Sequence, residues 1–147
     1  MASPMLSRRA LLRALAIVGC LAAGAAAAQD PRATQVQHAA REWLALVDRL
    51  DAAASFNSAG EKFRTPITQE AWADAIEKTH TSLGAVGQRA ILGTSFDRAE
   101  PPGGGPEIDI AVVLFRTVFA KKAGGTESVT LALDPDGAWR VIGYFIR

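Results

Sequence analysis

The sequence predicts an α+β domain in which three N-terminal helices pack on one face of a curved four-stranded antiparallel sheet. Three observations predict this class. Apolar residues follow helical spacing between residues 35 and 83, β-branched residues fill the strand segments between 88 and 147, and Pro- and Gly-rich turns separate those segments. Helices that precede strands along the chain, rather than alternating with them, favour a layer of helices on an antiparallel sheet.

The first 28 residues are predicted to be a signal peptide, and residues 29–147 a single α+β domain. The leader has three arginines and no acid up to residue 13, then an apolar stretch, then small residues ending at Ala28. That stretch is too short to span a bilayer. We therefore expect cleavage near Ala28, a periplasmic or secreted protein, and no integral membrane span in the mature chain.

Two details of the leader leave the export route open. The pair Arg8-Arg9 resembles a twin-arginine signal, which would export the folded domain, although leader arginines are common in any exported chain. The run from Ile17 to Cys20 resembles a lipobox, which would make the protein a lipoprotein anchored at Cys20. The residues after Cys20 are apolar, however, whereas a lipoprotein tether is usually polar.

The three helices are predicted from apolar spacing and from their end signals. The first has one apolar face, and the second, over residues 51–63, is interrupted by Gly60. The third begins after a Thr68 cap and ends at Gly84. The expected buried positions are Val36, Ala39, Ala40, Trp43, Leu44, Val47 and Leu50, then Ala53, Phe56, Ala59 and Phe63, then Trp72, Ile76, Thr79 and Leu83.

Four strands are expected after the helices, joined by marked turns. A flexible loop over residues 100–106 and a tight turn over 134–137 interrupt the strand pattern. Because the second segment is long, we expect it to bend, so that the sheet wraps a helix and leaves a cavity at its mouth. The predicted strands cover residues 88–97, 108–121, 127–134 and 139–147.

Charge and composition exclude several classes of function. Taking the three leader arginines from the formal charge of +1 leaves −2 for the rest of the chain, so nucleic acid is not an expected partner. Cys20 is the single cysteine and lies in the leader, so the mature domain forms no internal disulfide. No nucleophile motif, metal-spaced ligand set or phosphate-binding loop is present, so no catalytic residue, metal or cofactor is expected.

Two segments carry a resemblance to a known family. The first is the ending from Glu127 to Arg147, above all its final Gly-Tyr-Phe-Ile-Arg, and the second is Trp72-Ala73-Asp74-Ala75 together with residues 83–89. They resemble the secreted bacterial domain-of-unknown-function family 4019. The resemblance implies a cystatin-like, or nuclear-transport-factor-2-like, cone. It implies no catalytic residues, because that family has no established activity. The fold does not decide the function either, because that superfamily includes both enzymes and binding modules.

The candidate ligand-binding residues are Tyr144, Arg116, Trp72 and Arg89. Tyr144 could donate a hydrogen bond inside the cone, and either arginine could bind an anion. Simple alternation places Tyr144 on one face of the last strand with Arg140, Ile142 and Ile146, opposite Trp139, Val141 and Phe145. Each candidate also has an ordinary structural explanation, and His38 and His80 are weaker candidates for a base.

Two functions are compatible with this pattern. The first is a non-enzymatic module that binds a small apolar or anionic ligand or a protein partner. It could form a homodimer through an open sheet face containing Phe115 and Phe119. The alternative is an isomerase or lyase that uses Tyr144 with an acid or a histidine. A carboxylate or histidine facing Tyr144 inside a closed cavity would favour the enzyme.

Overall fold

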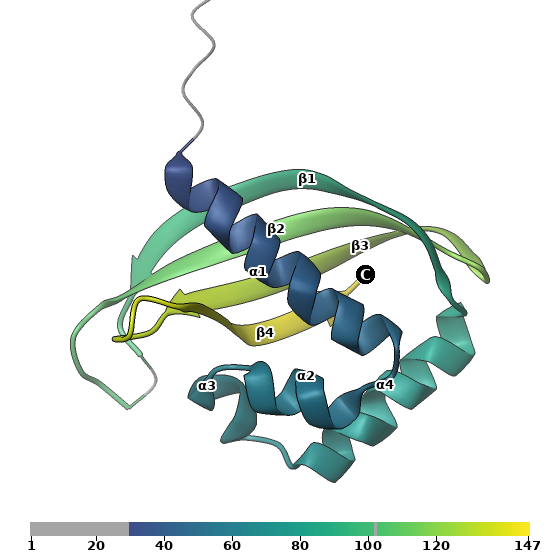
Figure 1. Cartoon of the computed structure of the whole chain (residues 1–147), viewed down its shortest axis with the longest axis horizontal. Coiled ribbons are helices and arrows are strands. Elements are labelled where there is room, and N and C mark those ends of the chain that lie inside the picture. The colour runs from purple at the N-terminus through teal and green to yellow at the C-terminus, as the bar shows by residue number, and fades with distance from the viewer. Residues whose placement is uncertain (1–29, 102) are drawn as a thin grey trace, which may run out of the picture.

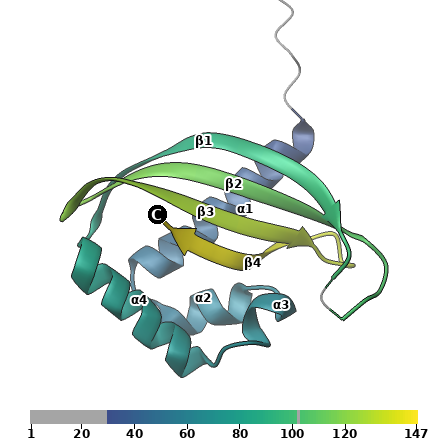
Figure 2. The same ribbon diagram turned by 180° about the vertical axis from the view of Figure 1, so that it is seen from behind.

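The computed structural model describes residues 30–101 and 103–147, so the expected signal peptide and Cys20 lie outside the described residues. A curved antiparallel sheet, ordered β1-β2-β3-β4, has all the helices on one side (Figures 1 and 2). The α+β class expected from the sequence is confirmed. The elements are α1 (Pro31–Asp48), α2 (Ala52–Ser58), α3 (Glu61–Arg64), α4 (Gln69–Leu83), β1 (Val86–Ala99), β2 (Ile108–Phe119), β3 (Lys122–Leu133) and β4 (Trp139–Ile146).

The helix ends follow local sequence signals. The side chains of Asp30, Asp51 and Thr68 each accept a hydrogen bond from a backbone N–H in the first turn of α1, α2 and α4. Gly84 ends α4 with φ +78°, and a Cβ there would lie 2.9 Å from the Cβ of Ala120. The caps predicted at Thr68 and Gly84 are confirmed.

The second predicted helix is divided into α2 and α3, which corrects the expected count of three helices to four. Ala59 and Gly60 are extended, and the Gly60 N–H donates to the carbonyl of Val141 at 2.8 Å. This hydrogen bond attaches the segment between α2 and α3 to β4. Ala53, expected to be buried, is exposed, and Ser55 is buried instead. Ser55 faces the core because it accepts hydrogen bonds from Trp43 and Trp72.

The core lies between α1 and the concave face of the sheet. Most of the predicted face of α1 is buried, whereas Leu50 is 40% exposed in the turn after the helix, where its φ is +58°. Trp43 stacks on Trp72 at 5.6 Å between ring centroids, and the Nε1 atoms of both donate to Ser55. Buried residues of the sheet include Ala111, Val113, Phe115, Val129, Leu131 and Val141.

The predicted faces of β4 are wrong because the strand contains a bulge. Thr130 pairs with Gly143 and Leu131 with Val141, so Ile142 is the extra residue in β4. The alternation reverses there. Tyr144 packs against the core on the same side as Trp139 and Val141, while Phe145 is 57% exposed on the opposite side.

Strand β2 also corrects one assignment. Phe115 and Phe119 point towards the helices and are buried, so they cannot form the open face of a homodimer; the dimer itself stays a prediction. Arg116 lies on the outer, exposed side with Leu114. Strand β3 starts at Lys122 rather than at 127, because only a short turn separates it from β2.

No helix among the described residues 30–101 and 103–147 is long and apolar enough to cross a membrane.

Candidate functional site

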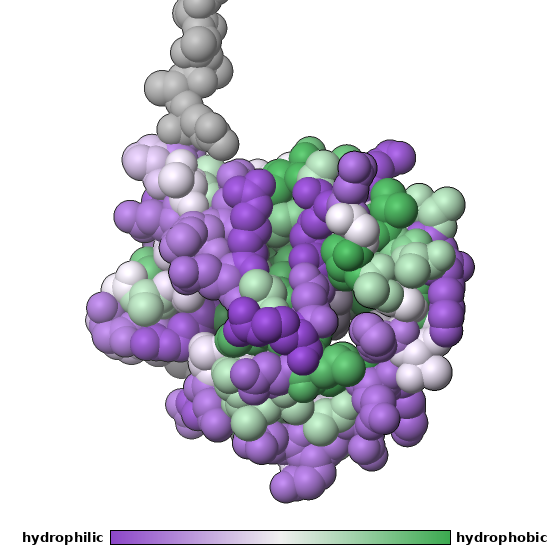
Figure 3. Space-filling view, turned by 45° about the vertical axis from the view of Figure 1, so that its right-hand side comes forward, coloured by the Kyte–Doolittle hydropathy of each residue, from purple (hydrophilic) through white to green (hydrophobic). Residues whose placement is uncertain are grey.

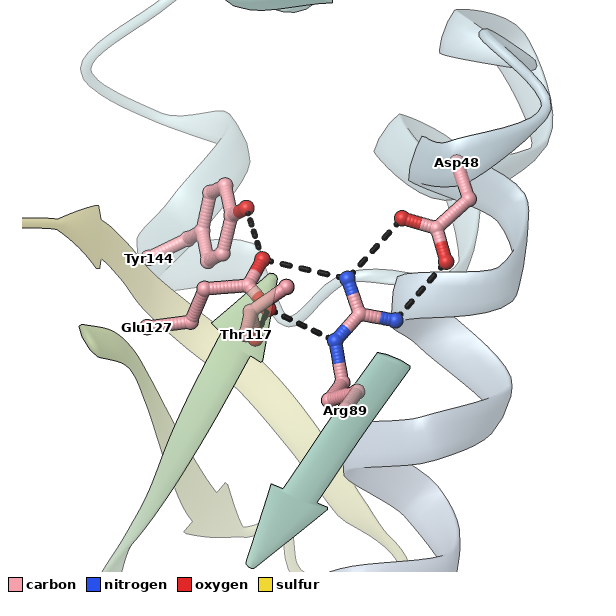
Figure 4. Close-up of polar contacts among 5 residues, drawn as sticks. All are labelled: Asp48, Arg89, Thr117, Glu127 and Tyr144. Atoms are coloured by element: carbon pink, nitrogen blue, oxygen red, sulfur yellow. Dashed lines mark hydrogen bonds and ion pairs between the residues drawn. The ribbon is translucent and has the colours of Figure 1, made fainter. Parts of the chain in front are cut away.

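A fully buried carboxylate, Glu127, lies at the centre of a polar network on the inner face of the sheet (Figure 4). Its Oε2 accepts from the Nε of Arg89 at 2.6 Å and from the hydroxyl of Thr117. Its Oε1 accepts from the hydroxyl of Tyr144 at 2.6 Å and from the Nη2 of Arg89 at 3.1 Å. Four hydrogen bonds therefore compensate for the burial of this charge.

Strand register brings these residues together. Arg89 on β1 pairs with Thr117 on β2, and Glu127 on β3 pairs with Phe115, the next inward residue of β2. Tyr144 joins them because the bulge at Ile142 turns it inward. The network therefore crosses all four strands, and its members meet only when the whole sheet has formed.

Asp48 extends the network to the C-terminal end of α1. Its two carboxylate oxygens accept from the Nη1 and Nη2 atoms of Arg89 at 2.7 and 2.9 Å. Burial acts to lower the pKa of Arg89, but the hydrogen bonds to Asp48 and Glu127 outweigh it and hold that pKa above its ordinary value. Arg89 is therefore a permanent cation that links the first helix to the sheet.

Tyr144 connects the network to an aromatic cluster. Its ring lies 5.3 Å from that of Trp43 and 6.3 Å from that of Trp72, both edge-on. Burial, and then the negative charge and hydrogen bond of Glu127, raise the pKa of Tyr144 far above its ordinary value. The phenol therefore keeps its proton and donates a hydrogen bond to Glu127.

A pocket of about 540 Å³ opens between α4, the C-terminal end of α1 and the inner face of the sheet. It exists because α4 packs mainly against α2 and diverges from the strands. Figure 3 turns this end of the molecule forward and shows apolar surface around a hollow with polar side chains at its edge. Its lining includes Trp72, Ile76, Leu83, Val86, Phe119 and Tyr144.

The predicted site residues separate into two groups. Trp72 and Tyr144 line the pocket, and Arg89 lies behind it in the network. Arg116 is on the other side of the sheet and does not join them. His80 lines the pocket, whereas His38 is 71% exposed and faces Glu42 on α1.

Sequence reasoning missed Glu127, Asp48 and Thr117. One signal was available for two of them. Glu127 is in phase with the inward residues Val129 and Leu131, and Thr117 with Phe115, so two polar residues occupy core positions of adjacent strands. Asp48 gave no such signal, because a charged residue at a helix end is ordinary.

The described residues contain no group of three His, Cys, Asp or Glu side chains arranged to hold a metal ion. Both carboxylates of the network are paired with Arg89. The chemistry of the site is therefore that of an apolar pocket with a neutral phenol, backed by a compensated charge network.

Comparison with known proteins gives one family and a few distant structures. The model of a family described as "Protein of unknown function (DUF4019)" matches residues 39–144, which confirms the resemblance expected from the sequence. No curated protein matches the chain.

Among solved structures, a protein from Catenulispora acidiphila is similar, with 12% identity, a TM-score of 0.50 and coverage of 79% of this chain and 90% of that one. ActVI-ORFA from Streptomyces coelicolor has 18% identity, a TM-score of 0.45 and coverage of 79% and 93%. Aln2 from a Streptomyces species has 13% identity, a TM-score of 0.49 and coverage of 81% and 92%. At such low identity, the first of these likenesses concerns the fold alone.

Proposed function

We propose that the chain, which belongs to the DUF4019 family of proteins of unknown function, binds a small, largely apolar molecule in the pocket between α4 and the sheet. The observation that carries this proposal is the apolar stripe of α4. Trp72 and Ile76 are buried in the core, but Thr79 and Leu83 continue the stripe along the pocket wall. A volume of about 540 Å³ is in the range of small-molecule sites.

The alternative, an isomerase or lyase, has one observation in its favour, since a buried carboxylate does face Tyr144. The hydrogen bonds argue for binding instead. A general base needs a free lone pair directed at the substrate, and Glu127 accepts four bonds while paired with Arg89. Tyr144 has its proton committed to Glu127, so stabilising an oxyanion would require breaking that bond first.

We also propose that this binding takes place outside the cytoplasm. The leader ending at Ala28 supports export, with anchoring at Cys20 as the alternative, and residues 29–147 are then the mature domain. The intact mass of the protein purified from an exporting host tests this. A mass equal to that of residues 29–147 supports cleavage after Ala28. The mass of a chain that starts at Cys20 and carries a lipid supports the anchor, and the mass of the unprocessed chain contradicts both.

The binding proposal is tested with the fluorescent apolar probe N-phenyl-1-naphthylamine and the protein purified from an exporting host. The variant Ala75→Trp places a large ring at the pocket wall, and Ala53→Trp adds the same ring to an exposed site on α2 away from the pocket. We expect saturable binding that Ala75→Trp weakens at least about tenfold, the equivalent of ~1.4 kcal/mol, and that Ala53→Trp leaves unchanged. Equal binding by both variants, or no binding, would contradict the proposal.

A further inference from the structure

At the inner end of the pocket, the hydrogen-bond donors are already paired, whereas acceptor oxygens still have room for a donor. The donors at its inner end are already used. The hydroxyl of Tyr144 donates to Glu127, the indole N–H of Trp72 donates to Ser55, and the hydroxyl of Thr79 donates to the carbonyl of Ala75. What Tyr144 still offers a ligand is the lone pair of its oxygen, which accepts and cannot donate.

Asp48 adds a second acceptor. It lines the pocket, its side chain is 30% exposed, and each of its oxygens takes only one hydrogen bond from Arg89. A carboxylate oxygen has room for a further donor. Asp48 and Tyr144 therefore present two acceptors, held in place by the same arginine and the same buried glutamate.

The net charge of the network also favours a ligand that donates hydrogen bonds. Asp48 and Glu127 bring two negative charges and Arg89 one positive charge, so the network carries one net negative charge beside an apolar wall. Further donors also line the pocket, of which Lys78 and Ser82 are exposed and Lys122 and His80 are half-buried. A lysine ammonium is strongly hydrated and sits on a flexible side chain, whereas two hydrogen bonds from Arg89 fix Asp48, so solvent and salt weaken the lysine charges more than those of the network.

Resting on the binding function proposed above, we propose that the ligand is an apolar molecule ending in a hydrogen-bond donor, best of all a primary ammonium group, which contacts Asp48 and the Tyr144 oxygen. The apolar part lies along Ile76, Leu83 and Phe119. A terminal hydroxyl makes the same contact without the charge and binds more weakly. A carboxylate finds two acceptors and a net negative charge, and is disfavoured.

Three probes with one apolar chain test this inference: decylammonium, decanol and decanoate. Each is titrated calorimetrically into the protein from an exporting host at pH 7, below the concentration at which the probe aggregates. We expect decylammonium to bind about tenfold or more tightly than decanoate, because a hydrogen bond to a charged group is the stronger kind. Decanol should fall between them. Asp48→Asn, which keeps the shape and removes one charge, should reduce the preference for decylammonium.

The outcomes separate this inference from the proposed function. If all three probes bind, Ala75→Trp blocks them, and decanoate binds as tightly as decylammonium, the pocket is real and the donor preference is wrong. Decanoate binding that is tightest and is lost in Lys122→Gln would assign the site to anions and also overturn the inference. If Ala75→Trp affects none of the three, the proposed function fails as well. Circular dichroism of each variant establishes that it is folded.

Discussion

Replacing Arg89 with methionine should destabilise the fold by several kcal/mol, because it leaves Glu127 as a buried charge without a counterion. The side chain of Glu127 is 0% exposed and that of Arg89 14%. Of the four hydrogen bonds to the carboxylate, those from Thr117 and Tyr144 would remain. Breaking a buried pair by removing one partner costs about 3–5 kcal/mol.

The other half of the network adds little to this estimate. Asp48 loses the same arginine, but its side chain is 30% exposed and water can replace the lost bonds. We therefore expect Arg89→Met to cost about 3 kcal/mol, the lower end of the range. Since small domains have unfolding free energies of about 5–15 kcal/mol, this is a large fraction of the total.

A double variant tests whether the buried charge is the cause. Arg89→Met combined with Glu127→Gln removes the charge and keeps the shape, so it should be more stable than Arg89→Met alone by at least about 1 kcal/mol. Arg116→Met is the matched control, because Arg116 is exposed on the outer side of the next strand. It should change stability by no more than about 0.5 kcal/mol.

The free energy of unfolding of the wild type and the three variants is measured by urea unfolding, followed by circular dichroism and by tryptophan fluorescence. Agreement of the two signals justifies a two-state free energy. The reasoning is refuted if Arg89→Met is within about 1 kcal/mol of Arg116→Met, or if adding Glu127→Gln to Arg89→Met makes the protein less stable still. The second result would mean that the two acceptor oxygens of residue 127, which Thr117 and Tyr144 need, matter more than its charge.

Three further predictions follow from single residues. The raised pKa of Tyr144, the chain's single tyrosine, predicts that phenolate absorbance at about 295 nm stays low above pH 10 and rises only when alkali unfolds the protein; a normal titration in the folded state would contradict this. Gly84→Ala should cost at least about 1 kcal/mol in urea unfolding, whereas Gly124→Ala, which meets nothing within 4 Å, should cost less; equal costs would be the contrary result. Arg140 lowers the pKa of Asp136 from 3.8 to about 2, so the contribution of Asp136 to stability is present above pH 3.8 and lost as the pH falls through 2. Asp136→Asn should flatten that acid dependence, and an unchanged slope would be evidence against it.

The class and the helices were predictable because their signals are local. The face of α1 follows from a period of about 3.6 residues, and the ends of α4 follow from Thr68 and Gly84, whose chemistry acts within one turn. Even the division of α2 from α3 had a signal at Gly60. What the local pattern lacked was the reason for the break, which is a hydrogen bond to Val141, distant in the sequence.

The site was only partly predictable because its members are joined by register. Arg89 and Glu127 are 38 residues apart, and only the pairing of three strands brings them together. Tyr144 lines the pocket, and its role in binding stays a prediction. Simple alternation predicts the wrong neighbours for it, since the bulge at Ile142 reverses the faces beyond it. The one local signal was Gly143, since a glycine inside a strand often marks a bulge. A glycine alone does not say which residue is the extra one, so the inward face of Tyr144 did not follow from it.

The position of the charge network supports a role beyond stability. A buried ion pair is often no more stabilising than well-packed apolar residues of similar size, so a fold that needed only a core could fill these positions with leucine and valine. An apolar set would leave Tyr144 without a partner and free to rotate or to donate its proton. The network instead fixes Tyr144 as an acceptor and positions Asp48 beside it at the same pocket. We therefore expect that replacing Arg89 and Glu127 together with apolar residues recovers the stability lost in Arg89→Met. The same double variant should lack the preference of the wild type for decylammonium over decanoate.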